Sequence, residues 1–466
     1  MSPLLFLSLA IASPFAALCI WIYFVFRTLM SASMRATELN PLHLDEGEVR
    51  KQAAELSKNP LNISYLPPAT GRRYVIVGGS GFVGGWIVRH LLLRGEDPKN
   101  IRIINKRPPV RKDIQPEGIG FVSADITNAH SVRSAFMAEW PRGSNTTARI
   151  TVFHTASVMR YYERQKALIS RSSGVNVDGT ENVIASAKAA GADILIYTSS
   201  GSLPLCRTSF WFLPWKRCPE TVVQVLNDTT PIAEEHDGFF SNYPYTKALA
   251  EKLVRDSHNP EAGFRTGILR PGAAIYGRGD GMSFDGLLSK MVNPSWMHST
   301  VQSVIYVENA SYAHLLYESR LLESQSASPT SPLHRLGGQA FMVTDGSNPV
   351  LYGDVYRALG TLTNNRVEFP RVPIGPILLV VQLLGFYHSL QAQYPRWLPP
   401  LQGGLARLQP PLLDLTLVSF KVDDSRARLP PEEGGLGYQP PWTTLQGICE
   451  VVNKHRRGEP PSRKYK

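Results

Sequence analysis

Tyr243 and Lys247 are the residues whose types and spacing best suit chemistry on an alcohol. They lie four positions apart, so on a helix both side chains share one face and can point into one cleft. A free tyrosine has a pKa of about 10, too high for a base at neutral pH, but a nearby ammonium stabilises the phenolate and lowers that pKa. The pair therefore predicts a general acid/base that takes a proton from an alcohol.

A pair of serines lies upstream, directly after the apolar run Ile194–Thr198, which predicts a strand. A hydroxyl at the end of a strand can orient a substrate hydroxyl beside the catalytic tyrosine. We assign this role to Ser200, with Ser199 as the alternative. The structural alternative is a Ser/Thr-rich turn.

Three glycines with the spacing Gly-x-x-Gly-x-x-Gly follow the apolar run Tyr74–Val77 and open a predicted helix. Glycine permits a sharp turn and a close approach of the backbone to a pyrophosphate, and the helix N-terminus then offers N–H groups and a positive dipole end. This pattern predicts a dinucleotide site, with a purely structural turn as the alternative. The predicted contacts are Gly78, Gly81, Phe82, Val83 and Gly84.

The end of the next predicted strand bears on which nicotinamide cofactor binds. An acidic residue there binds the ribose 2′-hydroxyl of NAD, whereas a basic residue accommodates the 2′-phosphate of NADP. Asn105 and Lys106 stand at this point, so we expect NADP, with NAD as the alternative. At the end of the following strand, Asp125 and Ile126 are expected to contact the adenine, and the alternative role for Asp125 is a helix N-cap.

Short β-rich runs alternate with helical stretches from Tyr74 to Pro271. The runs are Tyr74–Val77, Ile101–Ile104, Gly120–Ser123, Ile150–His154 and Ile194–Thr198, and the helical stretches are Gly84–Leu93, Ser131–Glu139, Val177–Ala190 and Tyr243–Asp256. This alternation predicts an α/β fold with a doubly wound parallel sheet of the Rossmann type. We assign 73–275 to this NAD(P)-binding domain and 276–445 to a smaller, interleaved substrate-binding lobe.

Further motifs resemble those of the extended short-chain dehydrogenases. The resemblance is to the 3β-hydroxysteroid dehydrogenase group, which includes the decarboxylating sterol-4α-carboxylate 3-dehydrogenases. It covers 74–438 and rests on Val75–Gly84, Phe153–Ser157, Val175–Thr180, Leu269–Pro271, Ile275–Gly277, Tyr306–Ala310, Asp424–Ala427 and Leu436–Pro440. The resemblance implies that Ala156 lies along the cofactor, that Asn176 supports the active site, and that Pro271 lies near nicotinamide and substrate.

The same resemblance implies NAD(P)-dependent oxidation of the 3β-hydroxyl of a sterol, steroid or triterpenoid. A 4-carboxysterol would then lose CO2. The alternatives are a dehydrogenase/isomerase without decarboxylation, a ketone reductase of secondary metabolism, and a cofactor-binding sensor or scaffold without catalysis. The chain departs from the family pattern at Val77, where Thr is frequent, and at Asn105, where Asp is usual. The stretch from Ser200 to Tyr243 is long and holds an aromatic cluster suited to an apolar substrate or membrane: Phe210, Trp211, Phe212 and Trp215.

The N-terminal segment predicts a membrane anchor over 1–30, since no charged residue lies between Ser2 and Phe26. Trp21 and Tyr23 suit the interface, and Arg27 after them predicts that the catalytic part faces the cytosol. A cleaved signal peptide is the alternative. We expect a single-pass protein of the endoplasmic reticulum, in which the Asn-x-Ser/Thr matches would stay unglycosylated.

Residues 31–72 are polar and predict a linker, and 446–466 predict a basic tail. The apolar segment 372–390 predicts contact with the membrane surface, with a buried core helix and a second span as alternatives. The four cysteines match no zinc motif and are expected to be reduced, with a Cys206–Cys218 bridge as the alternative. The composition (43% hydrophobic, 19% charged, net charge +11) is that of a globular protein and shows no pattern typical of nucleic-acid binders. Expected partners are a hydrophobic sterol-like substrate, membrane lipids, and either a second copy or other membrane sterol-processing enzymes.

Overall fold

A computed structural model describes residues 3–59, 62–210, 218–280, 283–346 and 348–458. Its centre is a seven-stranded parallel sheet with the order β11-β7-β5-β4-β1-β2-β3. The strands are β1 (Arg73–Val77), β2 (Ile101–Asn105), β3 (Gly120–Ser123), β4 (Ile150–His154), β5 (Ala192–Thr198), β7 (Arg265–Pro271) and β11 (Ala340–Val343). This order is that of doubly wound dinucleotide-binding sheets, so the predicted fold class is confirmed.

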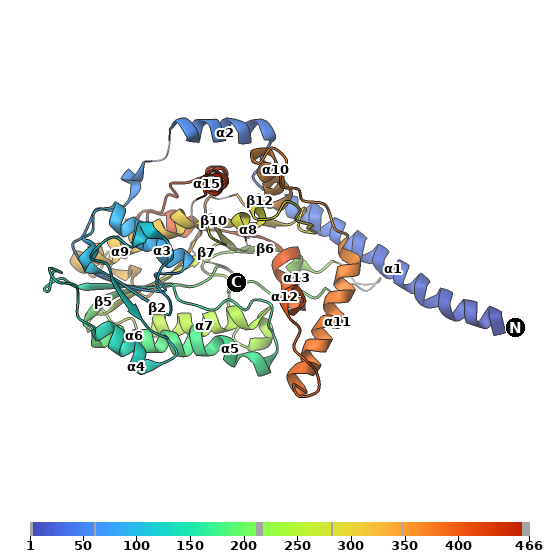
Figure 1. The fold of residues 1–466 in the computed structure, drawn as a ribbon, viewed down its shortest axis with the longest axis horizontal. Coiled ribbons are helices and arrows are strands. Elements are labelled where there is room, and N and C mark those ends of the chain that lie inside the picture. Colours follow the sequence, from blue (N-terminus) through green and yellow to red (C-terminus); the bar gives the residue numbers. More distant parts are fainter. Residues whose placement is uncertain (1–2, 60–61, 211–217, 281–282, 347, 459–466) are drawn as a thin grey trace.

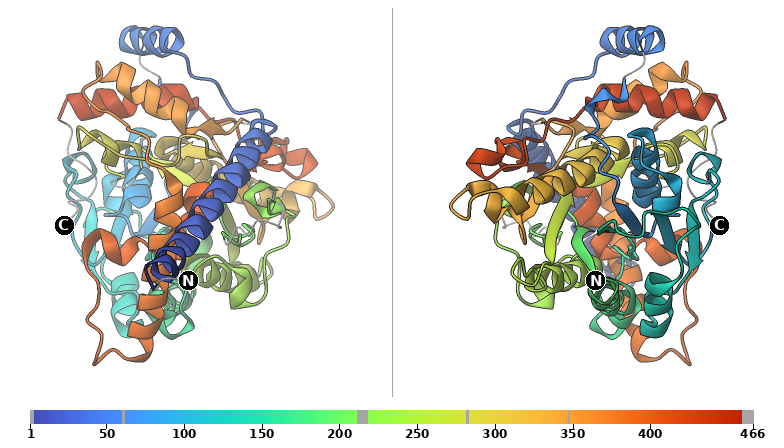
Figure 2. Two further views of the ribbon diagram at one scale, coloured as in Figure 1. Left: turned by 90° about the vertical axis from the view of Figure 1, so that its right-hand side faces the viewer. Right: turned by 90° about the vertical axis from the view of Figure 1, so that its left-hand side faces the viewer.

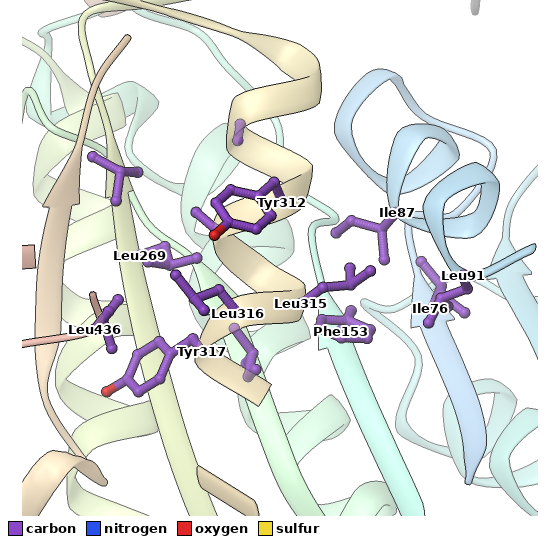
Figure 3. Close-up of a cluster of buried hydrophobic side chains, with 14 of the residues drawn as sticks. Ile76, Ile87, Leu91, Phe153, Leu269, Tyr312, Leu315, Leu316, Tyr317 and Leu436 are labelled. Carbon is purple, nitrogen blue, oxygen red and sulfur yellow. The ribbon is translucent and has the colours of Figure 1, made fainter. Parts of the chain in front are cut away.

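Helices cover both faces of the sheet (Figure 1). One face carries α3 (Phe82–Leu93) and α9 (Val307–Ser326), and the other carries α4 (Ala129–Met137), α6 (Gly179–Ala189) and α7 (Asn242–Asp256). Because the strands are buried on both faces, they are almost continuously apolar. Figure 3 shows the first face, where the helices bury apolar side chains against β1, β4 and β7: Ile76, Ile87, Leu91, Phe153, Leu269, Leu315 and Leu316.

Residues from 274 onward, together with the earlier strand β6 (Val223–Leu226), build a smaller lobe and also complete the sheet. Helix α9 and strand β11 both follow residue 275, yet they pack on or pair within the Rossmann body. The lobe itself holds two small sheets, made by β8 (Ala274–Tyr276) with β10 (Val304–Tyr306), and by β6, β9 (Val301–Gln302), β12 (Val350–Leu351) and β13 (Ser419–Val422). Its helices are α8 (Phe284–Leu288), α10 (Tyr352–Leu362), α12 (Gly403–Arg407), α13 (Pro410–Leu417), α14 (Ser425–Arg428) and α15 (Thr444–Arg456).

Two segments predicted as linker and tail pack against the body instead. Helix α2 (Glu46–Lys58) lies within the predicted linker and contacts α10 and α15, because its apolar residues Val49 and Leu56 are buried there. The predicted basic tail begins inside α15, whose apolar face is buried: Ile448, Cys449, Val451 and Val452. The tail residues 459–466 lie outside the described residues.

Two long apolar helices lie at the edge of the body. Helix α1 (Pro3–Thr37) continues past the predicted end of the anchor, contacts α11 (Ile374–Gln393) and extends beyond the rest of the molecule (Figure 1 and Figure 2). Both helices are long and apolar enough to cross a membrane. Most residues of α11 are at least partly exposed, so the alternative of a buried core helix for 372–390 is wrong.

The structure also describes the two cysteines and part of the aromatic cluster that follow β5. Cys206 and Cys218 are both free thiols, so the Cys206–Cys218 bridge does not form. Of the predicted aromatic cluster, Phe210 is buried beside α1, α11 and α13, whereas Trp211, Phe212 and Trp215 lie outside the described residues.

Candidate active site

The glycine loop connects β1 to α3. The N–H of Gly78 donates to the carbonyl of Ile104 over 2.8 Å, and Gly78 itself has a φ of +89°, a conformation that favours glycine. A Cβ on Gly84 would meet the carbonyl oxygen of Gly78, and a Cβ on Gly78 would come within 2.7 Å of the backbone nitrogen of Ala156. The first turn of α3 is therefore held tightly against the loop and against the end of β4.

This loop fits a dinucleotide. The first N–H groups of a helix have no partner within the helix, so those of α3 are available to a pyrophosphate. The hydroxyl of Ser80 is buried and has no hydrogen-bond partner among the described residues, which suits a phosphate oxygen as its acceptor. Phe82 and Val83 form the same first turn. The glycines alone revealed this loop in the sequence, and Ser80 was missed there.

The residues expected at the adenosine end lie after β2 and β3. The amide nitrogen of Asn105 donates to the carbonyl of Arg107 over 2.9 Å. The ammonium of Lys106 lies 2.7 Å from the carboxylate of Asp125. Although slight burial alone would raise the pKa of Asp125, Lys106 and the Thr127 N–H and hydroxyl hold that pKa below its usual value.

The N-cap interpretation of Asp125 is wrong. Helix α4 is capped by Asn128, whose side chain accepts from the N–H of Ser131 over 3.0 Å. Asp125 instead closes the preceding turn by accepting from the N–H of Thr127 over 3.1 Å. Ile126 is buried and packs against Gly179 at the start of α6. Asp125 therefore lies just after the end of β3, where an adenosine would bind.

Helix α7 carries Tyr243 and Lys247, as the sequence predicted. Tyr243 lies in its first turn, and Lys247 is 2% exposed. The ammonium of Lys247 donates to the carbonyl of Thr198 over 2.5 Å and lies 4.2 Å from the ring centre of Tyr197. Burial lowers the pKa of Lys247 to about 7, and the carboxylate of Glu251 acts in the opposite direction.

The lowering of the Tyr243 pKa that the sequence predicted is outweighed by burial. Burial raises the pKa of Tyr243 to about 12, and an interaction with the Ser200 hydroxyl opposes this rise. The ammonium of Lys247 is directed at Thr198 instead. Ser200 therefore lies beside Tyr243, as expected.

The two serines after β5 have different partners. The Ser200 hydroxyl lies 2.9 Å from that of Ser202. Ser199 donates to Oε2 of Glu251 over 2.7 Å, and the Arg270 guanidinium donates to both carboxylate oxygens of Glu251 over 3.0 and 2.6 Å. Ser199 thus belongs to a buried ionic network, and only Ser200 faces the tyrosine.

The last two predicted residues support this corner. Gly201 donates to the carbonyl of Pro271 over 2.8 Å, which joins the serine turn to the end of β7. Asn176 lies in a π-helical turn, Gly174–Asp178, and its amide nitrogen donates to Val158 and to the Thr246 hydroxyl, each over 3.0 Å. Such a turn inside a helix is frequent at functional sites.

The structure brings the predicted residues to one edge of the sheet. All paired strands of the sheet run parallel, so the ends of β1, β2, β3, β4, β5 and β7 meet there, and open α/β sheets bind ligands at this edge. The sequence pattern missed Ser80, Thr198 and Glu251, since their contacts come from distant segments. One signal was available for Glu251, which lies four residues after Lys247 on the same helix face.

Comparisons with known proteins agree with this geometry. The 3-beta hydroxysteroid dehydrogenase/isomerase family matches residues 75–371. The sterol-4-alpha-carboxylate 3-dehydrogenase erg26, decarboxylating, of Schizosaccharomyces pombe is 30% identical over 65% of this chain and 79% of its own length. The 3 beta-hydroxysteroid dehydrogenase type 7 of Mus musculus is 28% identical over 79% of this chain and 91% of its own length.

Solved structures show the same fold. A UDP-glucose 4-epimerase from Thermotoga maritima aligns with a TM-score of 0.54 at 14% identity, over 83% of this chain and 99% of its own. The Thermus thermophilus UDP-glucose 4-epimerase in complex with NAD aligns with a TM-score of 0.51 at 16% identity, over 82% of this chain and 99% of its own. At these identities the likeness concerns the fold alone.

Proposed function

The chain belongs to the 3-beta hydroxysteroid dehydrogenase/isomerase family and is an NAD(P)-dependent oxidoreductase, and from this premise we propose that it oxidises the 3β-hydroxyl of a sterol. The observation that carries the proposal is the corner at the end of β5, where Ser200 lies beside Tyr243 and Lys247 is buried behind them. The glycine loop ends at the same sheet edge.

In this function Tyr243 takes the proton of the substrate hydroxyl and Ser200 orients its oxygen. Lys247 would contact the ribose of the bound cofactor and, through its charge, would favour the phenolate of Tyr243. NAD(P)⁺, when bound, supplies the acceptor for the hydride that leaves the alcohol carbon. The glycine loop would hold its pyrophosphate, with Asn105 and Asp125 at its adenosine end. Proton and hydride leave together, and the alcohol becomes a ketone.

The substrate we propose is a 4-carboxysterol. Once the 3-hydroxyl is a ketone, a carboxylate on the neighbouring carbon is that of a β-keto acid, which loses CO2 without further catalytic groups. The Schizosaccharomyces pombe relative, which is named as a decarboxylating enzyme, supports this proposal. The second candidate is oxidation without decarboxylation, because the mouse type 7 relative, which matches a large share of this chain, is named only as a 3 beta-hydroxysteroid dehydrogenase.

We further propose that the catalytic body is held at a membrane, where such a substrate dissolves. Helix α1 would span the bilayer, and α11 would lie in its surface, with the body on the cytosolic side of the endoplasmic reticulum. Large apolar side chains of both helices are exposed, among them Phe26 (62%) and Leu383 (71%). Exposed apolar surface of this extent is typical of membrane or protein contact. Other membrane sterol-processing enzymes, or a second copy, are the proposed protein partners.

The test uses membranes that contain the full chain. They are incubated with a 4-carboxysterol or a plain 3β-hydroxysterol, with NAD⁺ or NADP⁺, and the products are identified by mass. We expect a 3-ketosterol with loss of CO2 from the first substrate. The rate should rise from neutral to alkaline pH, since burial raises the pKa of Tyr243 to about 12 and oxidation needs its phenolate.

Tyr243→Phe should abolish turnover and leave cofactor binding nearly unchanged. Tyr245→Phe is the matched control, because the Tyr245 ring packs against His236 and Phe239 at ring distances of 5.1 and 5.6 Å. Turnover of neither sterol by the wild-type chain would refute the proposed function. An active Tyr243→Phe variant would refute the role of the tyrosine.

A further inference from the structure

A chain of three hydrogen bonds connects Lys247 to the opposite side of the sheet. Lys247 donates to the carbonyl of Thr198 over 2.5 Å. The hydroxyl of the same threonine lies 2.7 Å from Nε2 of His314, and Nδ1 of His314 lies 2.7 Å from the carbonyl of Ala310. We propose that His314 is a positioning residue, which fixes the strand end that holds the Lys247 ammonium; this inference rests on the proposed role of Lys247.

The direction of each hydrogen bond follows from the chemistry of the partners. The carbonyl of Ala310 can only accept, so Nδ1 of His314 carries the proton. Burial lowers the pKa of His314 to about 4, so the ring is neutral at physiological pH and its Nε2 is an acceptor. The Thr198 hydroxyl therefore donates to His314, and its side chain is fixed in one rotamer.

The position of Thr198 makes this contact important for Lys247. It is the last residue of β5, and successive residues of a strand point to opposite faces. Its side chain points to the face covered by α9, while its carbonyl receives the ammonium from α7. The pairing of β5 with β7 fixes the next backbone N–H, because the N–H of Ser199 donates to the carbonyl of Leu269 over 2.7 Å. His314 adds the restraint on the threonine side chain.

The other groups that face Lys247 do not replace this restraint. Glu251 raises its pKa through charge, and Tyr197 offers only its ring face, at 4.2 Å. His154 lies near enough for the lysine charge to lower its pKa further, beyond the effect of burial. The Thr198 carbonyl is thus the acceptor that places the ammonium.

The first experiment measures the pH profile of kcat in Thr198→Val and His314→Phe. A less firmly placed ammonium stabilises the Tyr243 phenolate less, so the acid limb should move to higher pH by roughly one unit, the effect of losing about one hydrogen bond to a charged group. KM for the sterol should change little. Thr198→Ser, which keeps the hydroxyl, should shift the limb less than Thr198→Val, and the double variant should shift it no further than either single one.

Thr266→Val on β7 is the matched control. This threonine is also buried in the central sheet, but its hydroxyl has no hydrogen-bond partner among the described residues. The pH profile of kcat of Thr266→Val should keep the acid limb of the wild type. Profiles of folded Thr198→Val and His314→Phe that superimpose on the wild type would overturn the proposal. A uniform loss of rate without a shift of the limb would overturn it too, since that is the signature of a merely structural role.

The second experiment needs no turnover. The affinity for NAD(P) is measured by the quenching of protein fluorescence, with and without Lys247→Met. Thr198→Val and His314→Phe should each weaken binding about fivefold when Lys247 is present and not at all in the Lys247→Met background. An equal weakening in both backgrounds overturns the positioning role. If the wild-type chain oxidises no sterol, the proposed function fails, and this cycle still decides the role of His314.

Discussion

The Ser199 hydroxyl donates to the Glu251 carboxylate over 2.7 Å, while the neighbouring Ser200 faces Tyr243. Two adjacent serines at one strand end therefore have separate tasks. Ser200→Ala should lower kcat by about two orders of magnitude, a typical size for the loss of one positioned group, and leave the melting temperature unchanged. Ser199→Ala should do the reverse, because it removes one donor to a buried carboxylate. A loss of kcat in Ser199→Ala but not in Ser200→Ala would show that Ser199, and not Ser200, orients the substrate.

The glycine loop offers a matched pair within one helix. A Cβ on Gly84 would meet the carbonyl oxygen of Gly78, whereas a Cβ on Gly85 would meet Ile114 at 3.4 Å, an ordinary contact. Gly84→Ala should therefore weaken NAD(P) binding at least about tenfold, since the helix must move away from the loop. Gly85→Ala should bind almost normally. Equal affinities of the two variants, measured by fluorescence titration, would contradict this account of the loop.

The choice between NAD and NADP depends on the end of β2. Lys106 is already paired with Asp125 at 2.7 Å, which reduces what it can offer to a 2′-phosphate. Asn105 lacks the carboxylate that would repel such a phosphate, so we still expect NADP to be accepted. Asn105→Asp should lower kcat/KM for NADP⁺ about tenfold or more relative to NAD⁺, through charge repulsion. An unchanged ratio in coupled assays would remove this residue from cofactor selection.

The runs of β6 and β7 were not recognised as strands, although five strands of the central sheet and four of its helices could be predicted from the sequence, because each has its own local pattern. Strand β11 could not, since Ala340–Val343 is short and joins the sheet only through pairing with β7. In the site, the spacing of Tyr243 and Lys247 was sufficient to predict their shared face. The direction of the Tyr243 pKa was not predictable, because it depends on burial by residues far away in the chain.

The apolar face of α11 should enter the outer part of a bilayer. Val380, Leu383 and Phe386 recur every three residues and are all exposed. A bimane label on Leu383→Cys, in full-length protein with Cys19, Cys206 and Cys218 replaced by serine, should be quenched by lipids with brominated acyl chains. A label on Met137→Cys, at the end of α4, should not be quenched. Equal quenching at both sites would argue against membrane contact by α11.

A buried ion pair joins α15 to α9. The ammonium of Lys454 lies 2.7 Å from the carboxylate of Glu308, and the Tyr306 hydroxyl donates to the same oxygen over 3.1 Å. Lys454→Met leaves a buried carboxylate without its counter-charge and should lower the free energy of unfolding by about 3–5 kcal/mol. Lys252→Met, which breaks an exposed pair with Asp256, should cost less than about 1 kcal/mol in the same urea titrations.

The pH dependence of this ion pair gives a sharper test. Burial alone would raise the pKa of Glu308, but Lys454 and His90 hold it well below its usual value. A carboxyl whose folded pKa is depressed stabilises the protein above its unfolded pKa, and this contribution is lost as the pH falls through the acidic range below that value. Without Lys454, burial should dominate and raise the pKa of Glu308. Lowering the pH should therefore protonate this carboxylate in the variant and remove its buried charge. The free energies of unfolding of wild type and Lys454→Met should therefore converge as the pH falls. A difference between them that stays constant from neutral pH to the acidic range would show that Lys454 acts through packing instead.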